Sequence, residues 1–157
     1  QGDKNGLNLY QIKFFKEGSE QPFVINSRYD PKELEEISIY SKFKEDLIKK
    51  ELYITMEPTL SGKATIAFAE IDKYLENPYL FNLPTYPALL RELEGNDLPI
   101  ITCDDVSEAK GVIKFKIGEK NEIYNENACI ILEALNEDEL IKVADRLSLT
   151  ALGIMEV

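Results

Sequence analysis

The chain has 157 residues, of which 44% are hydrophobic and 30% are charged, and it carries a formal net charge of -11 at pH 7. This length and apolar content fit one folded domain with its own core. The negative charge repels phosphate backbones and anionic lipid surfaces, so we expect no nucleic-acid partner and no anionic membrane surface. Histidine is absent, which excludes Ser-His and Cys-His nucleophiles and the commonest zinc ligand.

The ends of the sequence bear on the compartment. The sequence starts at Gln1 without an initiator methionine, and it has no apolar run near the ~20 residues that span a bilayer. We therefore expect either a mature chain after signal-peptide removal or a chain trimmed of its ends, and a membrane anchor could have been lost from either side. Residues 1–6 are polar and glycine-rich and are expected to be disordered. The abundance of Lys and Glu is typical of thermophile proteins, although AT-rich genomes give it too.

The first third of the chain predicts a hairpin and two helical segments. Residues 10–14 alternate between apolar and polar side chains, and an apolar run at 23–25 follows a turn at 17–19, which indicates a β-hairpin. Asp30 and Pro31 suit the cap and the first position of a helix. A second helical segment is expected at 42–51.

The middle of the chain predicts a strand, a helix and then an irregular region. A buried strand is expected at 52–56, followed by a helix capped by Ser61, and this order is the first half of a βαβ crossover. A short helix is expected at 88–94. The aromatic residues before it either line a ligand groove or cap the core; they are Tyr79, Phe81 and Tyr86.

The last third predicts the centre of the fold. Residues 99–103 are apolar on both sides, which is typical of a strand covered on both faces. Residues 112–117 alternate, with Lys114 and Lys116 on one face, and predict either an edge strand or a strand with one solvated face, with the lysines discouraging further pairing. Residues 122–124 are expected to pair back, and residues 128–132 to form a buried central strand.

The sequence ends in an amphipathic helix that Asn136 caps. Its buried stripe runs from Leu140 to Ile154. Leu149 and Leu152 lie off this stripe and predict a second contact, either with another helix or with another subunit, so a homo-oligomer formed through this helix is one expectation. Together the elements predict a single α/β domain over residues 1–157, with one mixed sheet of about five to seven strands packed by helices.

The two cysteines lie 26 positions apart, at Cys103 and Cys129. If the two apolar segments that carry them are neighbours, a disulfide would close the loop, contribute roughly 3–4 kcal/mol and indicate an oxidising compartment. The alternative is two separate buried thiols. A redox pair is not indicated, because the cysteines do not form a C-x-x-C motif.

The loop around Ser61 lies where a phosphate-binding loop would lie. The pattern is incomplete, because Glu57 stands where the first glycine is needed and Ala64 stands where Ser or Thr should follow Lys63. A nucleotide site is therefore not predicted. The first N–H groups of the helix remain able to bind an anion on general grounds.

Acidic residues follow the apolar segment 99–103. Asp104, Asp105 and Glu108 are candidate ligands for Ca²⁺ or Mg²⁺, and the alternative is a solvated loop with a capping aspartate. Glu70 and Asp72 lie on the helix opposite Ile71 and are expected at the surface.

Four segments carry a resemblance to a known group of proteins. They are residues 58–65 (PTLSGKAT), 98–105 (LPIITCDD), 127–133 (NACIILE) and 144–155. In combination they resemble uncharacterised archaeal proteins of the secreted or cell-envelope-associated class. The resemblance implies an extracytoplasmic location and supports pairing of the two cysteines. It supplies no catalytic residues.

These observations favour a non-enzymatic extracytoplasmic or cell-surface domain for interaction or ligand binding. One alternative is a hydrolase or transferase that uses a divalent metal near Asp104 and Asp105. Another is a structural subunit that assembles with itself. The sequence assigns no catalytic residue and no ligand-binding residue, and no cofactor is expected.

Overall fold

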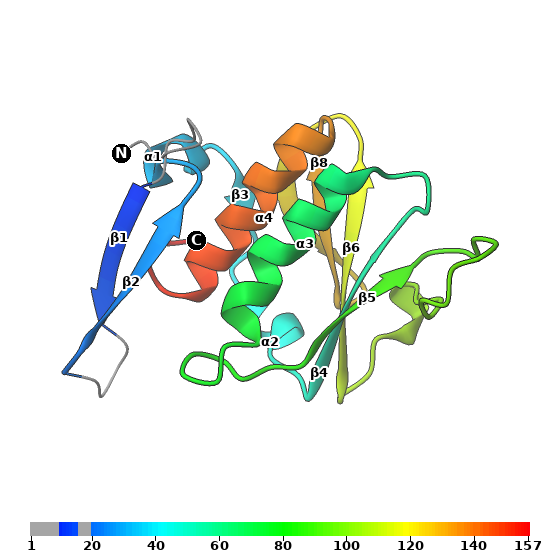
Figure 1. Ribbon diagram of the computed structural model, residues 1–157, viewed down its shortest axis with the longest axis horizontal. Coiled ribbons are helices and arrows are strands. Elements are labelled where there is room, and N and C mark those ends of the chain that lie inside the picture. The colour runs from blue at the N-terminus through cyan, green and yellow to red at the C-terminus, as the bar shows by residue number, and fades with distance from the viewer. Residues whose placement is uncertain (1–9, 16–19) are drawn as a thin grey trace.

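The computed structural model describes residues 10–15 and 20–157. The disorder expected for residues 1–6 and the turn expected at residues 17–19 lie outside this part of the chain. The described residues form a six-stranded mixed sheet, a separate two-stranded sheet and helices (Figure 1). The predicted α/β class, a mixed sheet packed by helices, is confirmed.

The large sheet has the strand order β3-β7-β8-β6-β4-β5. Its strands are β3 (Ser38–Ile39), β4 (Glu51–Met56), β5 (Thr85–Leu89), β6 (Lys110–Ile117), β7 (Glu122–Glu126) and β8 (Cys129–Ala134). Strands β8, β6, β4 and β5 run parallel to one another, whereas β7 runs antiparallel to β8. The carboxyl ends of these parallel strands therefore lie along one edge of the sheet, which we call the carboxyl edge.

Two helices, α3 (Gly62–Leu75) and α4 (Glu137–Ala151), lie side by side on one face of this sheet (Figure 1). Both begin where the sequence predicts, because side chains cap them. The Ser61 Oγ accepts a hydrogen bond from the Lys63 N–H at 3.3 Å, and the Asn136 Oδ1 accepts one from the Glu139 N–H at 2.9 Å. The main core lies between these helices and the sheet.

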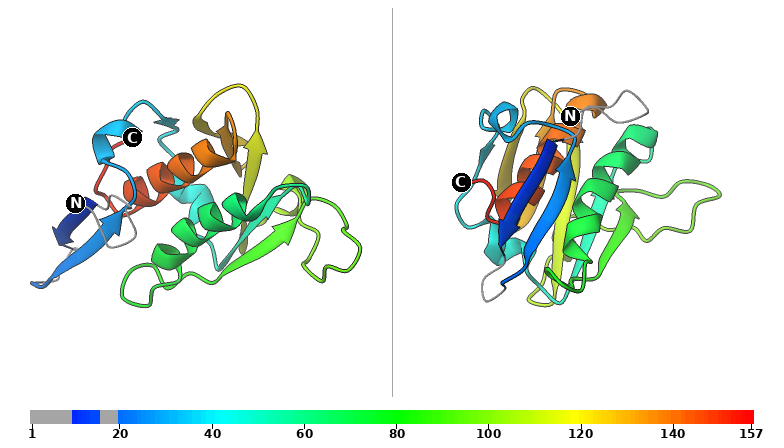
Figure 2. Two further views of the ribbon diagram at one scale, coloured as in Figure 1. Left: turned by 45° about the horizontal axis from the view of Figure 1, so that its top comes forward. Right: turned by 60° about the vertical axis from the view of Figure 1, so that its left-hand side comes forward.

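The shorter helices and the hairpin also pack around the main core. Helix α1 (Pro31–Leu34) packs against α4, and α2 (Phe43–Leu47) packs against β6 and β8. The predicted hairpin pairs β1 (Tyr10–Phe15) with β2 (Pro22–Ser27), and both views of Figure 2 show it beside the last turns of α4. Its Ile25 is buried in the main core. Leu149 is also buried there, and Leu152 packs against it, so both contacts lie within this chain.

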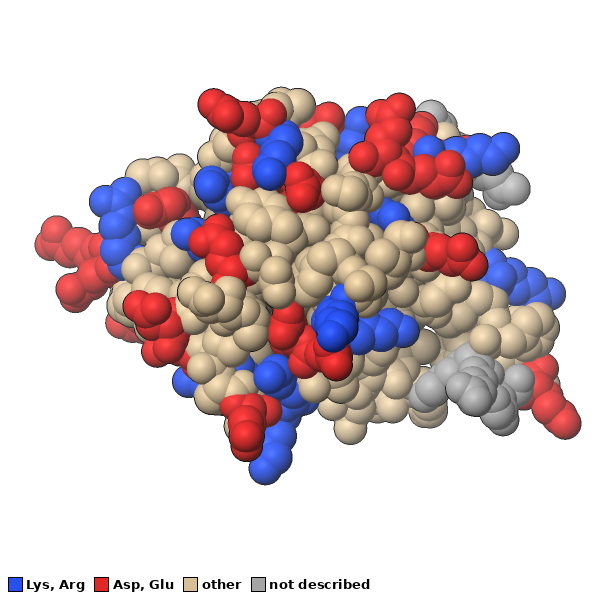
Figure 3. Space-filling model, turned by 180° about the vertical axis from the view of Figure 1, so that it is seen from behind, with Lys and Arg blue, Asp and Glu red and all other residues tan. Residues whose placement is uncertain are grey.

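A smaller core lies on the opposite face of the sheet, which we call the open face. Its buried members are Ala88, Ile101, Val112, Cys129 and Ile131. A 3-10 turn, η1 (Cys103–Asp105), and the residues before it cover this core. A disulfide joins Cys103 to Cys129 with a Cα–Cα distance of 5.3 Å, and the predicted bridge is confirmed. Seen from behind, side chains of both charges lie scattered over this side of the protein (Figure 3).

The segment 99–103 is not the strand that its composition predicts. It makes an isolated bridge, between Ile100 and Leu89, and Ile100 is 46% exposed. Its apolar residues instead serve the small core, into which Ile101 is buried. A short apolar run is equally consistent with a strand and with a segment that covers a core.

Three other parts of the chain also differ from the sequence prediction. The helix expected at 88–94 is absent, because residues 85–89 pair with β4 as the parallel strand β5. The sequence predicts no strand at Ser38 and Ile39, which form β3. Of the two alternatives predicted for β6, the edge strand is wrong, because β6 lies between β8 and β4. Lys114 and Lys116 follow Val112 at alternate positions, so they lie on the open face near the carboxyl edge.

Candidate functional site

A cleft of about 470 Å³ lies at the carboxyl edge, between α3, the end of β4 and the chain that follows β5. Its lining is mainly apolar and includes Met56, Leu60, Phe68, Pro87, Leu89, Leu93 and Leu98. The polar lining residues include Ser61, Thr65 and Asn96. In α/β folds with parallel strands, ligands bind outside the carboxyl ends of the strands, which is where this cleft lies.

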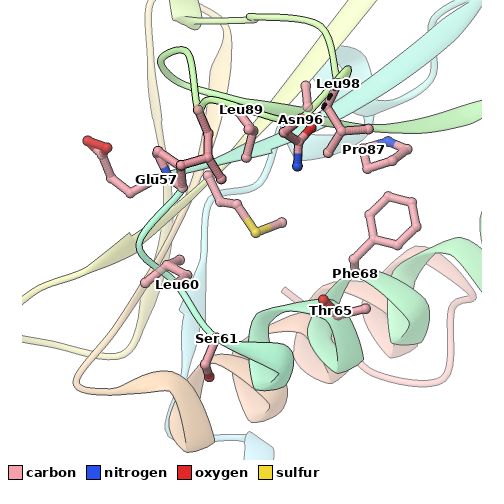
Figure 4. A pocket seen from close by; sticks show the side chains of 13 residues that line it. Glu57, Leu60, Ser61, Thr65, Phe68, Pro87, Leu89, Asn96 and Leu98 are labelled. Carbon is pink, nitrogen blue, oxygen red and sulfur yellow. Dashed lines mark hydrogen bonds between the residues drawn. The ribbon is translucent and has the colours of Figure 1, made fainter.

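Two elements give the cleft its opposite walls. The cap at Ser61 fixes the start of α3, and Thr65 and Phe68 lie one turn apart on the helix surface that faces the cleft. Figure 4 shows these side chains pointing across the cleft toward Pro87 and Asn96, and the Glu57 carboxylate pointing away from it. Phe68 therefore offers an aromatic surface to any molecule in the cleft.

The outer lip of the cleft is the loop of residues 90–99. Both ends of this loop are held by backbone hydrogen bonds, from the Leu89 N–H to Pro99 O at 3.0 Å and from the Leu90 N–H to Met56 O at 2.9 Å. Within it, the Asn96 Oδ1 accepts a hydrogen bond from the Leu98 N–H at 2.8 Å. The lip is thus fixed at its base, and it brings Leu93, Asn96 and Leu98 to the cleft.

The amino end of α3 is occupied by a carboxylate of the chain itself. Both the N–H and the Oγ of Ser61 donate to Glu137 Oε1, at 2.7 and 2.6 Å. Lys63 Nζ lies 2.8 Å from Asp138 Oδ1, and this hydrogen bond raises the pKa of Lys63. The anion suggested for this helix end is therefore supplied by the first turn of α4.

A second hollow, of about 350 Å³, adjoins the cleft on the other side of the β4–α3 loop. The two share Glu57 and Leu60 as lining residues. We call the second one the lysine hollow, because Lys114 and Lys116 line it together with Thr59, Leu90, Phe115 and Ile117. The apolar cleft thus borders a hollow that contains two cations.

The charges around the lysine hollow are unequally paired. Lys116 Nζ lies 3.9 Å from Glu133 Oε1, whereas Lys114 forms no ion pair with any residue that the structure describes. The Glu133 carboxylate accepts hydrogen bonds from the Tyr124 hydroxyl at 2.7 Å and from the Glu119 N–H at 2.8 Å. The bond from Tyr124 lowers the pKa of Glu133, so this carboxylate is held as an anion by its own neighbours.

The acidic residues after Thr102 serve the backbone. Asp105 Oδ2 accepts a hydrogen bond from the Thr102 N–H at 2.8 Å, and Thr102 Oγ1 accepts one from the Asp104 N–H at 3.2 Å, which is a capping box. Asp104 and Glu108 are exposed. Over residues 10–15 and 20–157, no three acidic or cysteine side chains come together as a group that could hold a metal ion, so Asp104, Asp105 and Glu108 do not form one.

Glu70 is not at the surface, as the sequence predicts, but is 4% exposed. Arg28 Nε lies 2.8 Å from Glu70 Oε1, and Lys73 forms a second ion pair with Glu70. Asp145 of α4 is buried in the same region, and within the described chain its Oδ2 has no hydrogen-bond partner. Burial, followed by the nearby charge of Glu70, raises the pKa of Asp145 to about 8.

The aromatic residues that were candidates for a groove do not line the cleft. Tyr79 is 74% exposed, Phe81 packs against the main core, and Tyr86 lies beside Tyr53 with 5.3 Å between ring centroids and a tilt of 35° between the ring planes. The lining of the cleft was not predicted from the sequence, because its residues come from three separate segments of the chain. The one available signal was the position of the β4–α3 loop in a βαβ unit.

Comparisons place no known protein beside this chain: no family model, no curated protein and no solved structure matches it. In the described part of the chain, no helix is both long and apolar enough to cross a membrane.

Proposed function

We propose that this protein is a ligand-binding domain that takes a small, largely apolar molecule into the cleft at its carboxyl edge. The observation that carries the proposal is the cleft itself, because its 470 Å³ volume, apolar walls and few polar groups are those of small-molecule sites. Phe68 and Met56 provide polarisable apolar surface, and Thr65 and Asn96 provide groups that fix orientation.

An extracytoplasmic or cell-surface location is part of this proposal. It is supported by the disulfide between Cys103 and Cys129, because such bonds persist in oxidising compartments and are rare in the reducing cytosol of mesophiles. We propose that the domain captures its ligand outside the cytoplasm.

Fluorescence titration with N-phenyl-1-naphthylamine, a neutral apolar probe, tests the binding function. The matched variants are Leu93→Ser on the lip of the cleft and Ile48→Ser after α2, because the two side chains are similarly exposed, at 43% and 47%. We expect saturable binding that Leu93→Ser weakens several-fold and Ile48→Ser leaves unchanged. Absence of saturable binding, or equal weakening by both variants, would overturn the proposal.

A further inference from the structure

We infer that the ligand is a single-chain amphiphilic anion, whose apolar chain lies in the cleft and whose carboxylate lies in the lysine hollow against Lys114. This inference rests on the proposed function, because it names the class of molecule that the same site binds. The structural basis is that the two hollows share Glu57 and Leu60 and so lie next to each other.

Two cations lie close together near the end of β6. Lys114 and Lys116 lie two residues apart on β6, so both side chains point to the same face of the sheet, about 7 Å apart along the strand. Both line the lysine hollow, at the end of β6 that is nearest the β4–α3 loop. A head group that reached past Leu60 from the cleft would meet these ammonium groups.

Charged side chains beside the two hollows differ in whether they form ion pairs. Arg91 Nε pairs with Glu57 Oε2 at 2.9 Å, so the carboxylate shared by the two hollows already has a cation. Glu133 takes its hydrogen bonds from Tyr124 and the Glu119 backbone, and Lys116 stands near it. Lys114 is half-buried and, within the described residues, has no ion pair.

The whole chain has 29 acidic and 18 basic residues. Carboxylates are plentiful, yet none lies within ion-pair distance of Lys114 in the described structure. Removing a cation from water without a counter-charge is costly. A ligand carboxylate offsets this cost, whereas a ligand ammonium would add to it, so the hollow favours an anionic head group.

The size of the site limits the ligand to one chain. A volume of 470 Å³ lies toward the lower end of the roughly 300–1,000 Å³ range of small-molecule pockets. A free medium-chain carboxylate fits this limit, and a two-chain lipid does not. The net charge of -11 also disfavours docking of the whole protein on an anionic bilayer.

The test compares three head groups on one chain at pH 7.4 by isothermal titration calorimetry: octanoate, octanol and octylammonium. We expect octanoate to bind about tenfold more tightly than octanol, and octylammonium to bind most weakly. The variant Lys114→Met should reduce octanoate affinity to that of octanol and leave octanol affinity unchanged. The matched control is Lys44→Met on α2, which removes one exposed lysine at the opposite end of β6.

The outcomes separate the two proposals. If octanol and octanoate bind equally, the inference about the head group is wrong and the apolar binding function stands. If neither binds, both are overturned. If Lys44→Met weakens octanoate as much as Lys114→Met does, only the overall charge matters and the assignment to Lys114 is wrong. Binding of phosphatidylglycerol vesicles in place of octanoate would likewise overturn the single-chain ligand.

Discussion

Arg91 Nε lies 2.9 Å from Glu57 Oε2, and this ion pair connects the lip after β5 with the loop after β4. Both side chains are largely in water, with exposed fractions of 64% and 45%. The pair lies where the apolar cleft meets the lysine hollow, since Glu57 lines both. Exposed ion pairs contribute about 0–1 kcal/mol to the free energy of unfolding, so this pair adds little to stability. Its main effect is to balance the charge of Glu57 beside the two hollows.

The variant Arg91→Gln should weaken octanoate binding several-fold, because it leaves the Glu57 charge unpaired beside the carboxylate of the ligand. Octanol affinity and the free energy of unfolding should change little. Calorimetric titration and urea unfolding measure these quantities. The double variant Arg91→Gln with Glu57→Gln is the control, and it should restore octanoate affinity. Equal losses for octanol and octanoate would show that Arg91 shapes the lip and does not balance charge.

The variant Cys103→Ser with Cys129→Ser should lose about 3–4 kcal/mol of unfolding free energy, as the chain-entropy model gives for a separation of 26 residues. Urea unfolding of the oxidised parent and of the variant measures the loss. In the parent, neither thiol should react with iodoacetamide in denaturant until reductant is added. Alkylation without reductant, in protein prepared under oxidising conditions, would contradict the bridge and weaken the extracytoplasmic proposal.

Stability should fall as the pH rises from about 4 to about 8, because of Asp145. Its pKa in the folded state is about 8, raised from an ordinary value of 3.8 by burial and by Glu70, against the opposing charges of Lys73 and Arg28. Over this range the folded protein holds a proton that the unfolded chain releases. The contribution of the protonated carboxyl is full below pH 4 and is lost as the pH passes 8.

The variant Asp145→Asn should remove most of this pH dependence. We expect the parent to lose about 2–5 kcal/mol of unfolding free energy between pH 5 and pH 9, and the variant to lose much less. The pKa of Asp72 is raised to about 6, so Asp72 acts in the same direction in both proteins. It leaves the variant with a smaller decrease in unfolding free energy as the pH rises. Urea unfolding at the two pH values measures this loss of unfolding free energy. An equal loss in the parent and the variant would refute the assignment to Asp145.

Gly118 allows the Glu133 carboxylate to lie under the β6–β7 turn. A Cβ at residue 118 would lie 2.7 Å from Glu133 Cδ, so Gly118→Ala must displace the carboxylate from its bonds with Tyr124 and the Glu119 N–H. We expect a loss of about 1–3 kcal/mol by urea unfolding. Gly62→Ala is the control, because no atom lies within 4 Å of its added Cβ, and it should be neutral. Equal stability of the two variants would contradict this role.

Local patterns predicted the two long helices, α3 and α4. The starts of α3 and α4 followed from Ser61 and Asn136, because a cap depends on residues close in sequence. The buried strand β8 also followed, because its apolar run is continuous. The disulfide was one of two alternatives, since its geometry depends on how η1 sits on the sheet.

Features that depend on distant segments were not predictable in the same way. The alternation in β6 showed that one face is solvated, but it did not show that β8 and β4 flank the strand. The periodicity of α3 placed Glu70 away from Ile71, but it did not reveal that Arg28 lies there. The cleft combines residues from α3, the end of β4 and the 90–99 lip, and no single segment carries its pattern.

The most direct test of the central claim is mapping of ligand contacts by amide chemical-shift changes in the ¹⁵N-labelled protein during titration with octanol. Ligand binding in the cleft predicts saturable shifts in residues 56–68 and 87–98, with little change in the β1–β2 hairpin or in α2. Saturable shifts confined to other surfaces, or no saturable shifts at all, would show that the cleft is not a binding site.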